Sequence, residues 1–325
     1  MKYLNSILEA IGHTPLVKLN KIIPDNGKEK LLLAKVEFMN PGGSIKDRMA
    51  IYMIEKALER GDLKPGGTII EATSGNTGVA LAMYGAIKGF KVILTVTEKV
   101  SREKIDHLRA FGAEVIICPG SARHGSPESR NAVAEKLALT TPNSFYVNQH
   151  ENEDNWRAHY ETTAPEIWED TEGRITHFVA GIGTGGTFTG VAKFLKEKNP
   201  KIRCITVDPV GSVFYPYYKE KILAEAVEYE LEGLGDDSLI RNVDFSVIDE
   251  MYQITDREAF LMTRRIAREE GLFVGGSSGA NVWAALKVYQ NAPSGSVIVT
   301  ILPDSGFKYL SKFYNDEWMR SKNFL

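Results

Sequence analysis

The amino-acid sequence predicts an α/β protein with two doubly wound, mostly parallel domains, each built of three α/β/α layers. Apolar runs of roughly four to eight residues alternate with helical patterns along most of the chain, which is typical of parallel sheets covered on both faces. The runs number about nine, more than one twisted sheet usually holds, so we expect two sheets. Glycine-rich segments follow several of the runs, where ligands bind in such folds.

The composition is ordinary for a soluble globular protein of the size of an enzyme, with 325 residues, 43% of them hydrophobic and 25% charged. With a formal net charge of −3 and no basic block, we expect no nucleic-acid partner. The N-terminus has no apolar signal region and no run reaches the roughly 18 apolar residues of a membrane span, so we expect a cytoplasmic protein without a membrane partner. Cys118 and Cys204 stand alone in separate apolar runs, which predicts neither a disulfide framework nor a metal site.

The first half of the chain begins with a turn and a short strand at 11–17 and continues as alternating strands and helices. Proline and glycine at 64–67 mark a turn. Ser126 and Pro127 predict a helix start, with a serine cap and a proline in the first position. The sequence predicts further strands at 31–38, 68–71, 91–97 and 114–118, and helices after Lys46, at 76–87 and at 101–111.

The second half repeats this alternation, and Thr255 to Glu258 has the spacing of a capping box. We place the division between the domains near 143–151. The smaller, substrate-closing domain is expected at 40–148, and the larger, phosphate-binding domain at 1–39 plus 149–325. The sequence predicts strands at 175–180, 202–208, 251–255 and 296–302, and helices from Gly186, from Thr255 and after Ser277.

The segment NPGGSIKD, from Asn40 to Asp47, lies between a predicted strand and a predicted helix. Ser44 is expected to cap the helix and Asp47 to complete a pair like a capping box. Lys46 then lies in the first helical turn, where the helix macrodipole disfavours a cation. It is either a solvated lysine or a desolvated amine that forms a Schiff base with an aldehyde cofactor.

Three loops follow predicted strands or open predicted helices. Thr73 to Gly78 offers hydroxyls, an amide and backbone N–H groups, which suit a carboxylate or phosphate unless the loop is only a capped turn. Gly181 to Thr187 suits a phosphate held by backbone amides, but it also matches a G-x-G-x-x-G pattern, with Asp208 ending the next strand. Gly275 to Gly279 contains serines that either cap a helix or face a ring nitrogen.

One hypothesis uses all three loops together with Lys46, namely binding of pyridoxal 5′-phosphate. The lysine would bind the aldehyde carbon, the second loop the phosphate and the first loop an amino-acid carboxylate, while the third would face the pyridine nitrogen. A nicotinamide-dependent dehydrogenase built on Gly181 to Gly186 uses only the second loop and leaves Lys46 without a role. The sequence therefore favours pyridoxal phosphate.

The motifs resemble those of the cystathionine β-synthase and cysteine synthase family of pyridoxal-phosphate enzymes, which implies a fold like that of the tryptophan synthase β-chain. The resemblance runs over nearly the whole chain, in the same order. The end of the chain looks most like the catalytic core of cystathionine β-synthase, so we expect neither a regulatory domain pair after it nor a haem segment before it. The shared segments are GHTPLVKL, NPGGSIKDR, TIIEATSGNTG, AHYETTA, GIGTGGT, VDPVGS, GGSSG and ILPDS.

The resemblance implies a role for each motif residue. Lys46 would be the Schiff-base lysine and the base that removes the α-proton, Asn76 would bond the 3′-oxygen of the cofactor, and Ser277 its pyridine nitrogen. Because a serine does not fix a proton on that nitrogen as an aspartate would, expulsion of a β-substituent is favoured over transamination. The implied phosphate-binding residues are Gly183, Thr184, Gly185, Gly186 and Thr187, and the implied substrate-binding residues are Thr73, Ser74, Gly75, Thr77, Gln149 and Gly233.

Two positions depart from the family pattern. His150, which follows Gln149, and Asp236, in the loop 232–237, each stand where a tyrosine is expected. Both are expected near the incoming nucleophile, where an imidazole and a carboxylate can bind an amino group, activate water or act as acid and base. Both are equally consistent with solvated loop residues.

The resemblance implies β-replacement on serine, O-acetylserine or cysteine through an aminoacrylate intermediate. Formation of cystathionine from serine and homocysteine is the leading expectation. Alternatives that share the first half-reaction are cysteine synthesis from sulfide, hydrogen sulfide release from cysteine and addition of an amino nucleophile, and a catalytically silent relative is a further alternative. We also expect a homodimer, and closure of the smaller domain over the substrate.

Overall fold

The computed structural model describes residues 1, 3–24, 29–73, 75–98, 100–122 and 126–325. The chain forms two compact units, one of Met1–Ile11 with Asn40–Asn155 and one of Gly12–Met39 with Trp156–Leu325. We call them the lysine unit and the glycine-loop unit. Residues 1–11 and 149–155 belong to the lysine unit, whereas the sequence analysis assigned them to the other domain.

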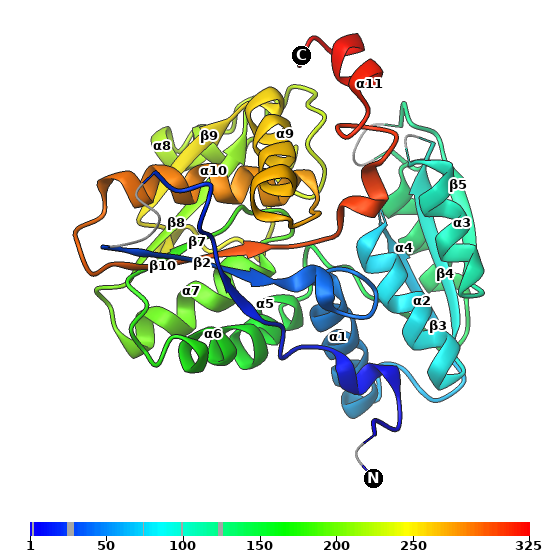
Figure 1. Cartoon of the computed structure of the whole chain (residues 1–325). Coiled ribbons are helices and arrows are strands. Elements are labelled where there is room, and N and C mark those ends of the chain that lie inside the picture. Colours follow the sequence, from blue (N-terminus) through cyan, green and yellow to red (C-terminus); the bar gives the residue numbers. More distant parts are fainter. Residues whose placement is uncertain (2, 25–28, 74, 99, 123–125) are drawn as a thin grey trace. The chain divides into compact units, whose positions relative to one another are not determined.

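The lysine unit contains a four-stranded, fully parallel sheet in the order β5-β4-β3-β6 (Figure 1). Ile70 of the inner strand β3 pairs with Ile93 on one side and Tyr146 on the other. Helices connect the strands, as parallel pairing requires. The elements are η1 (Ile7–Ala10), α1 (Lys46–Arg60), β3 (Thr68–Ala72), α2 (Asn76–Lys88), β4 (Lys91–Thr97), α3 (Arg102–Ala110), β5 (Glu114–Cys118), α4 (Arg130–Thr140) and β6 (Ser144–Tyr146), and α5 (Asp154–Ala158) crosses the boundary of the two units.

Helices cover both faces of this sheet. Ile93 of β4 packs with Ala134 of α4 in a small core. The next residue, Leu94, lies against Gly78 of α2. Successive side chains of a strand point to opposite faces, so α4 and α2 lie on opposite sides of the sheet. The predicted three-layer arrangement is therefore confirmed for this unit.

The glycine-loop unit contains a six-stranded sheet in the order β1-β2-β10-β7-β8-β9, in which only the edge strand β1 is antiparallel to its neighbour. Two segments are π-helical, η3 (His159–Thr163) and η5 (Ile266–Glu270). The other elements are β1 (Leu16–Lys18), β2 (Leu31–Val36), η2 (Glu37–Met39), α6 (Ala164–Asp170), β7 (His177–Val179), α7 (Gly186–Lys198), β8 (Arg203–Pro209), α8 (Phe214–Glu220), η4 (Phe245–Val247), β9 (Glu250–Ile254), α9 (Asp256–Arg265), α10 (Gly276–Asn291), β10 (Val297–Leu302), η6 (Gly306–Tyr309) and α11 (Asp316–Ser321).

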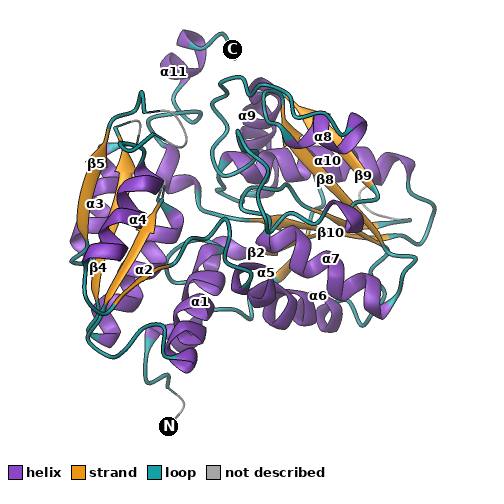
Figure 2. Cartoon of the chain, turned by 180° about the vertical axis from the view of Figure 1, so that it is seen from behind, coloured by secondary structure: helices purple, strands orange, loops and turns teal. Residues whose placement is uncertain are grey.

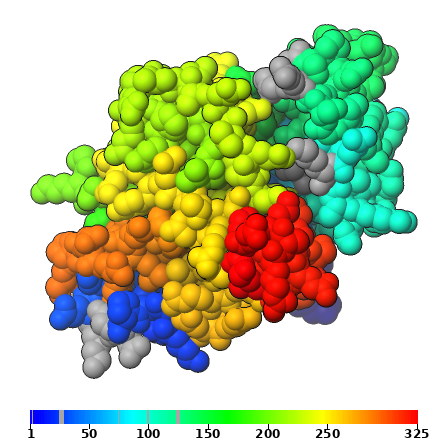
Figure 3. All heavy atoms as spheres, turned by 90° about the horizontal axis from the view of Figure 1, so that it is seen from above, coloured from blue at the N-terminus to red at the C-terminus, as the bar shows by residue number. Residues whose placement is uncertain are grey.

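The glycine-loop unit is layered in the same way, with α6 and α7 on one side of its sheet and α9 and α10 on the other (Figure 2). Phe178 of β7 contacts Phe188 of α7, while the next residue, Val179, belongs to the main core with α9 and α10. The C-terminal segment lies against α9 on the surface (Figure 3), where Trp318 and Phe324 contact Phe260. These aromatic contacts hold the end of the chain against the surface of α9, while Leu325 itself is exposed.

Two predicted helix starts are wrong in detail, whereas Thr255 does form the predicted capping box with Glu258. Helix α4 begins at Arg130, because Ser126 to Ser129 form a turn and Ser129 caps the helix. At α1 the carboxylate of Asp47 accepts the backbone N–H of Gly42 at 2.5 Å, so it does not complete a capping box with Ser44.

In the described ranges, no helix is long and apolar enough to cross a membrane. The same residues contain no group of three or more His, Cys, Asp or Glu side chains placed to hold a metal ion. Cys118 and Cys204 are both buried and free.

Candidate cofactor and substrate site

Lys46 is the first residue of α1 and is half-buried. The residues on both sides of it are anchored, because Ser44 Oγ accepts the backbone N–H of Lys46 at 3.2 Å and Asp47 is fully buried. A side chain at Gly42 would collide with the Asp47 carboxylate, which explains the glycine. The loop therefore fixes the backbone from which the lysine amine projects.

The loop after β3 begins α2 in the same unit. Its residue Gly75 has φ of +143°, a conformation that only glycine adopts readily, and it donates its N–H to Thr73 Oγ1 at 3.1 Å. Asn76 is the first residue of α2, and no side chain caps this helix among the residues that the structure describes. A helix N-terminus of this kind suits an anion. Ser74, which the sequence analysis placed in this site, lies outside the described residues.

Gln149 joins this loop from the segment after β6. Its side-chain oxygen accepts the hydroxyl of Thr77 at 2.7 Å, and its side-chain nitrogen donates to Glu71 at 2.9 Å. All three residues are buried. His150 follows and is half-buried. The structure thus brings Thr77 and Gln149 together, and it adds Glu71, which the sequence analysis did not single out.

The glycine loop lies between β7 and α7 in the other unit. A side chain at Gly183 would collide with the carbonyl oxygen of Gly233. Gly185 has φ of +83°, and a side chain there would meet the backbone of Asn242 at 2.6 Å. Helix α7 begins directly afterwards at Gly186, with no side-chain cap recorded in the described part of the chain. Backbone geometry therefore requires these glycines and leads into a helix N-terminus that suits a phosphate.

Two side chains outside the predicted set support this loop. Asn281 of α10 accepts the N–H of Gly181 at 2.7 Å and donates to the carbonyl of Ile301 at 2.9 Å. His159 is fully buried on the π-helical segment, with its ring nitrogens 3.2 Å from Thr187 Oγ1 and 2.9 Å from Thr163 Oγ1. π-Helical turns are frequent at functional sites. Only the position of these residues in the fold reveals their contacts.

Ser277 is the second residue of α10 and is buried. The backbone before it is fixed, because the N–H of Gly275 donates to the carbonyl of Asp304 at 3.0 Å. A side chain at Gly275 would collide with the Asp304 carboxylate. Since α10 also carries Asn281, which binds the glycine loop, Ser277 and that loop are held by one helix.

Asp236 and Gly233 lie in the loop that contacts Gly183. Gly233 is exposed, with φ of +82°. Asp236 is half-buried, and its Oδ1 accepts the N–H of Ser238 at 3.1 Å and the Ser238 hydroxyl at 2.9 Å. One carboxylate oxygen of Asp236 therefore stabilises its own turn.

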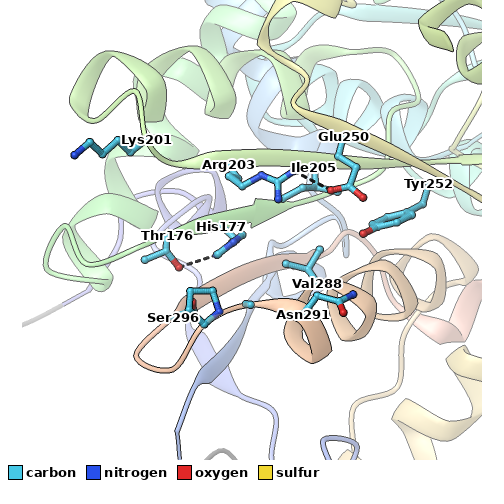
Figure 4. A pocket seen from close by; sticks show the side chains of 12 residues that line it. Thr176, His177, Lys201, Arg203, Ile205, Glu250, Tyr252, Val288, Asn291 and Ser296 are labelled. Carbon is cyan, nitrogen blue, oxygen red and sulfur yellow. Dashed lines mark hydrogen bonds and ion pairs between the residues drawn. The ribbon is translucent and has the colours of Figure 1, made fainter.

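A pocket of about 400 Å³ opens at the end of the six-stranded sheet where β7, β8 and β9 begin (Figure 4). The first residues of β7, β8 and β9 line it, and they include Arg203, which is paired with Glu250 at 2.9 Å. Burial and the Arg203 charge lower the pKa of His177 in its wall. None of the residues that the sequence analysis selected lines this pocket, and the glycine loop lies at the other end of β7.

These residues fit a phosphate-bearing aldehyde cofactor, because the glycine loop leaves no room for side chains, its helix lacks a side-chain cap in the described structure, and Lys46 is half-buried at an anchored helix start. A family model described as "Pyridoxal-phosphate dependent enzyme" matches residues 7–304. The chain belongs to this family of pyridoxal-phosphate dependent enzymes. The predicted family and cofactor are thereby confirmed, and the dinucleotide alternative finds no support.

Three relatives are more specific. The chain is 47% identical to cystathionine beta-synthase of Oryctolagus cuniculus over 324 residues, which cover 100% of this chain and 59% of the relative. It is 41% identical to the O-acetylserine dependent cystathionine beta-synthase of Helicobacter pylori, with a TM-score of 0.86 over 96% of this chain and 99% of that structure. The structure of an O-ureido-L-serine synthase is 36% identical, with a TM-score of 0.88 over 98% and 100%.

Proposed function

We propose that the protein catalyses β-replacement on serine, O-acetylserine or cysteine, with cystathionine formation from serine and homocysteine as the leading reaction. The observation that carries this proposal is the 47% identity to a cystathionine beta-synthase over the whole of this chain. The chain spans 59% of the length of that relative, so the proposal concerns the segment that the two share. The similarity to an O-acetylserine dependent enzyme of the same name supports O-acetylserine as an alternative first substrate.

In this proposal Lys46 attaches the cofactor and moves the α-proton of the substrate. When bound, pyridoxal phosphate supplies the electron sink for the carbanion that proton removal creates. Lys46 is half-buried at the start of a helix, where the macrodipole disfavours a cation. The macrodipole that makes Lys46 a poor choice for helix stability thus supports its chemistry.

The remaining cofactor contacts follow from the local structure of each unit. We propose that Gly183, Thr184, Gly185, Gly186 and Thr187 hold the phosphate at the start of α7. Ser277 would face the pyridine nitrogen as a neutral hydroxyl and Asn76 the ring 3′-oxygen. A neutral partner leaves the ring less electron-withdrawing than an aspartate would, so loss of the β-substituent competes better with reprotonation.

The substrate carboxylate would lie on the loop that begins α2. Thr73, Ser74, Gly75 and Thr77 supply hydroxyls and backbone N–H groups there, and Gln149 supplies its amide. The uncapped start of α2 described above adds the positive end of the helix macrodipole. These groups would orient the α-carbon toward Lys46 without taking part in bond breaking.

His150, Gly233 and Asp236 are proposed to contact the second substrate. The hydrogen bonds of Asp236 to Ser238 hold its carboxylate in one orientation. A carboxylate and an imidazole where a tyrosine is expected favour a nucleophile that carries an amino group. Homocysteine carries one, as do other amino nucleophiles, whereas sulfide does not. Cysteine synthesis from sulfide and hydrogen sulfide release from cysteine are the alternatives with the same first half-reaction.

Three expectations about the whole molecule remain proposals. We propose a cytoplasmic homodimer, on the basis of the family resemblance. The smaller domain, which we predicted at 40–148, would close over the substrate, because an exposed reactive intermediate would be lost to water.

A visible spectrum of the purified protein with and without substrates tests this function. We expect a cofactor band that changes on addition of serine, O-acetylserine or cysteine, and product formation when homocysteine or sulfide follows. The size of the change ranks the leaving groups, and the product identifies the nucleophile. A protein that cannot be loaded with pyridoxal phosphate, or whose band changes with none of the three amino acids, would contradict the proposal.

A further inference from the structure

Three buried side chains form a hydrogen-bonded chain beside the loop from Thr73 to Gly78 of the lysine unit. We call this segment the carboxylate loop, because it is proposed to bind the substrate carboxylate. Thr77 Oγ1 lies 2.7 Å from Gln149 Oε1, and Gln149 Nε2 lies 2.9 Å from Glu71 Oε1. Gln149 Nε2 also lies 3.3 Å from the carbonyl oxygen of Ala72. Thr77 and Gln149 are proposed carboxylate ligands, so the direction of these hydrogen bonds decides what they can offer a substrate.

The charge of Glu71 fixes that direction. An ionised carboxylate and a carbonyl oxygen can only accept, so both N–H bonds of the Gln149 amide must point toward Glu71 and Ala72. The amide oxygen then faces Thr77, whose single hydroxyl proton is taken by that oxygen. In this state Thr77 and the amide of Gln149 direct their donors away from a substrate carboxylate.

A proton on Glu71 permits the opposite direction. The protonated side chain donates one O–H, which Gln149 Oε1 can accept after the amide turns by half a rotation. The same turn removes the amide N–H from the carbonyl oxygen of Ala72. Gln149 Nε2 would then donate one N–H to Thr77 Oγ1. This frees the Thr77 hydroxyl proton and the second N–H of Gln149, and a carboxylate needs donors of this kind.

We propose that Glu71 is a positioning residue whose protonation reverses the Glu71–Gln149–Thr77 hydrogen-bond chain and so prepares Thr77 and Gln149 to bind the substrate carboxylate. The inference rests on the proposed function, because it deepens the role of two proposed substrate ligands. It adds a third residue that touches neither substrate nor cofactor.

The surroundings of Glu71 bring the pKa of its carboxyl group into the physiological pH range. Burial raises the pKa of Glu71 to about 8, against the lowering effect of the Gln149 and Asn148 backbone N–H groups and of Arg130 on α4. On β6, Tyr146 pairs with Ile70 and so points to the opposite face of the sheet from Glu71. Burial and the charges of Glu71 and Glu135 raise the pKa of its hydroxyl. From β4, the apolar Leu94 pairs with Glu71. Glu71 is therefore mainly protonated at neutral pH and loses its proton as the pH rises through about 8.

The first test compares the wild type with Glu71→Gln, whose amide can donate to Gln149 at every pH. We expect the KM for serine in the wild type, relative to that in Glu71→Gln, to rise about tenfold per pH unit above pH 8 and to be constant below pH 7. The substrate amine titrates in both proteins and cancels in the ratio. Glu55→Gln is the control, because Glu55 binds the hydroxyl of Tyr84 in the same unit at 2.7 Å. It should keep the wild-type pH profile.

The second test requires no turnover. In protein labelled with ¹³C at the glutamate carboxyl carbons, the resonance missing from Glu71→Gln should titrate near pH 8. L-alanine, which has a carboxylate and an amine but no β-leaving group, should raise that midpoint in the loaded enzyme, because it binds the protonated form better. If Glu71→Gln does not fold, Thr77→Val replaces it in the first test and should bind serine at neutral pH as weakly as the wild type does at high pH.

The inference would be overturned by a Glu71 resonance that titrates below about pH 6, or by a KM ratio that does not change with pH. The proposed function fails separately, through absence of a spectral change with serine, O-acetylserine and cysteine. A Glu71 midpoint that L-alanine leaves unchanged in a protein that still turns over serine contradicts the inference alone.

Discussion

In the proposed function, the two units bind ligands by different means. The carboxylate loop of the lysine unit relies on side chains, with Thr77 and Gln149 held by the buried Glu71. The glycine loop of the other unit relies on backbone shape, because side chains at Gly183 or Gly185 would collide with neighbouring backbone. Side chains can change protonation and hydrogen-bond direction, whereas a packed backbone cannot. In the proposed function, proton transfer therefore belongs to the lysine unit and the fixed phosphate contacts belong to the glycine-loop unit.

The largest effect is expected for Lys46→Ala. If the lysine unit supplies the proton-transfer group, turnover should fall by at least about 10³-fold and the cofactor band should be altered. Lys56→Ala, on the same helix but in an exposed pair with Glu59, is the control and should keep full activity. If Lys46→Ala retained turnover, the lysine unit would not supply the proton-transfer group.

A smaller but still large effect is expected for Gly183→Ala, which pushes a methyl group into the carbonyl oxygen of Gly233. The dissociation constant of pyridoxal phosphate, measured by equilibrium dialysis, should rise about 100-fold, because the loop backbone must move. Gly295→Ala is the control, since no atom of the described residues lies within 4 Å of a side chain added there, although φ is +83°. It should cost about 1 kcal/mol of stability and leave cofactor affinity unchanged. Equal cofactor affinity in both variants would show that the loop is not a rigid cradle.

Asp236→Asn tests whether a charged side chain of the glycine-loop unit also takes part in binding, because Asp236 belongs to that unit. The amide keeps an oxygen for Ser238 but loses the charge. We expect the ratio of kcat/KM for homocysteine to that for sulfide to fall about tenfold, a change of about 1.4 kcal/mol, while the spectral response to serine alone stays the same. If both steps decline together, Asp236 is a structural residue.

The smallest effect is expected for Ser44→Ala, which removes the 3.2 Å hydrogen bond to the backbone N–H of Lys46. Loss of this side-chain to backbone hydrogen bond should lower the free energy of unfolding by about 1 kcal/mol. Thermal unfolding measures that loss, and turnover should fall less than threefold because Asp47 still anchors the loop at Gly42. A greater than tenfold fall in turnover would assign Ser44 a direct part in the chemistry.

Most of the fold could be predicted from the sequence, because the spacing of apolar residues within each segment indicates whether it is a strand or a helix. The strand at 91–97 and the strand at 114–118 were placed with their observed bounds, and the helix from Gly186 begins where expected. The start of α4 was misplaced, since Ser126-Pro127 and Ser129 are competing signals and only the turn at 126–129 decides between them. Short-range signals of equal strength leave helix boundaries open.

The candidate site was predictable where residues act through motif chemistry and not where they act through distant contacts. Lys46 and the glycine loop stand in conspicuous segments. Glu71 gave one signal, a carboxylate inside the apolar run TIIEA, but its partner Gln149 is 78 residues away. Asn281 gave none, and His159 stands in the shared segment AHYETTA without an assigned role, because their contacts with the glycine loop span 100 and 28 residues.

The strand order of the six-stranded sheet has a consequence for synthesis of the protein. Strand β2, near the N-terminus, lies between β1 and β10, and β10 is the last strand of the chain. When domains form as the chain emerges from the ribosome, Asn40–Asn155 can assemble early as one continuous segment. Strands β1 and β2 must instead wait until Leu302 has been translated. We therefore expect the glycine-loop unit to be completed last. Until then the hydrophobic strand β2 of the growing chain must be protected from aggregation.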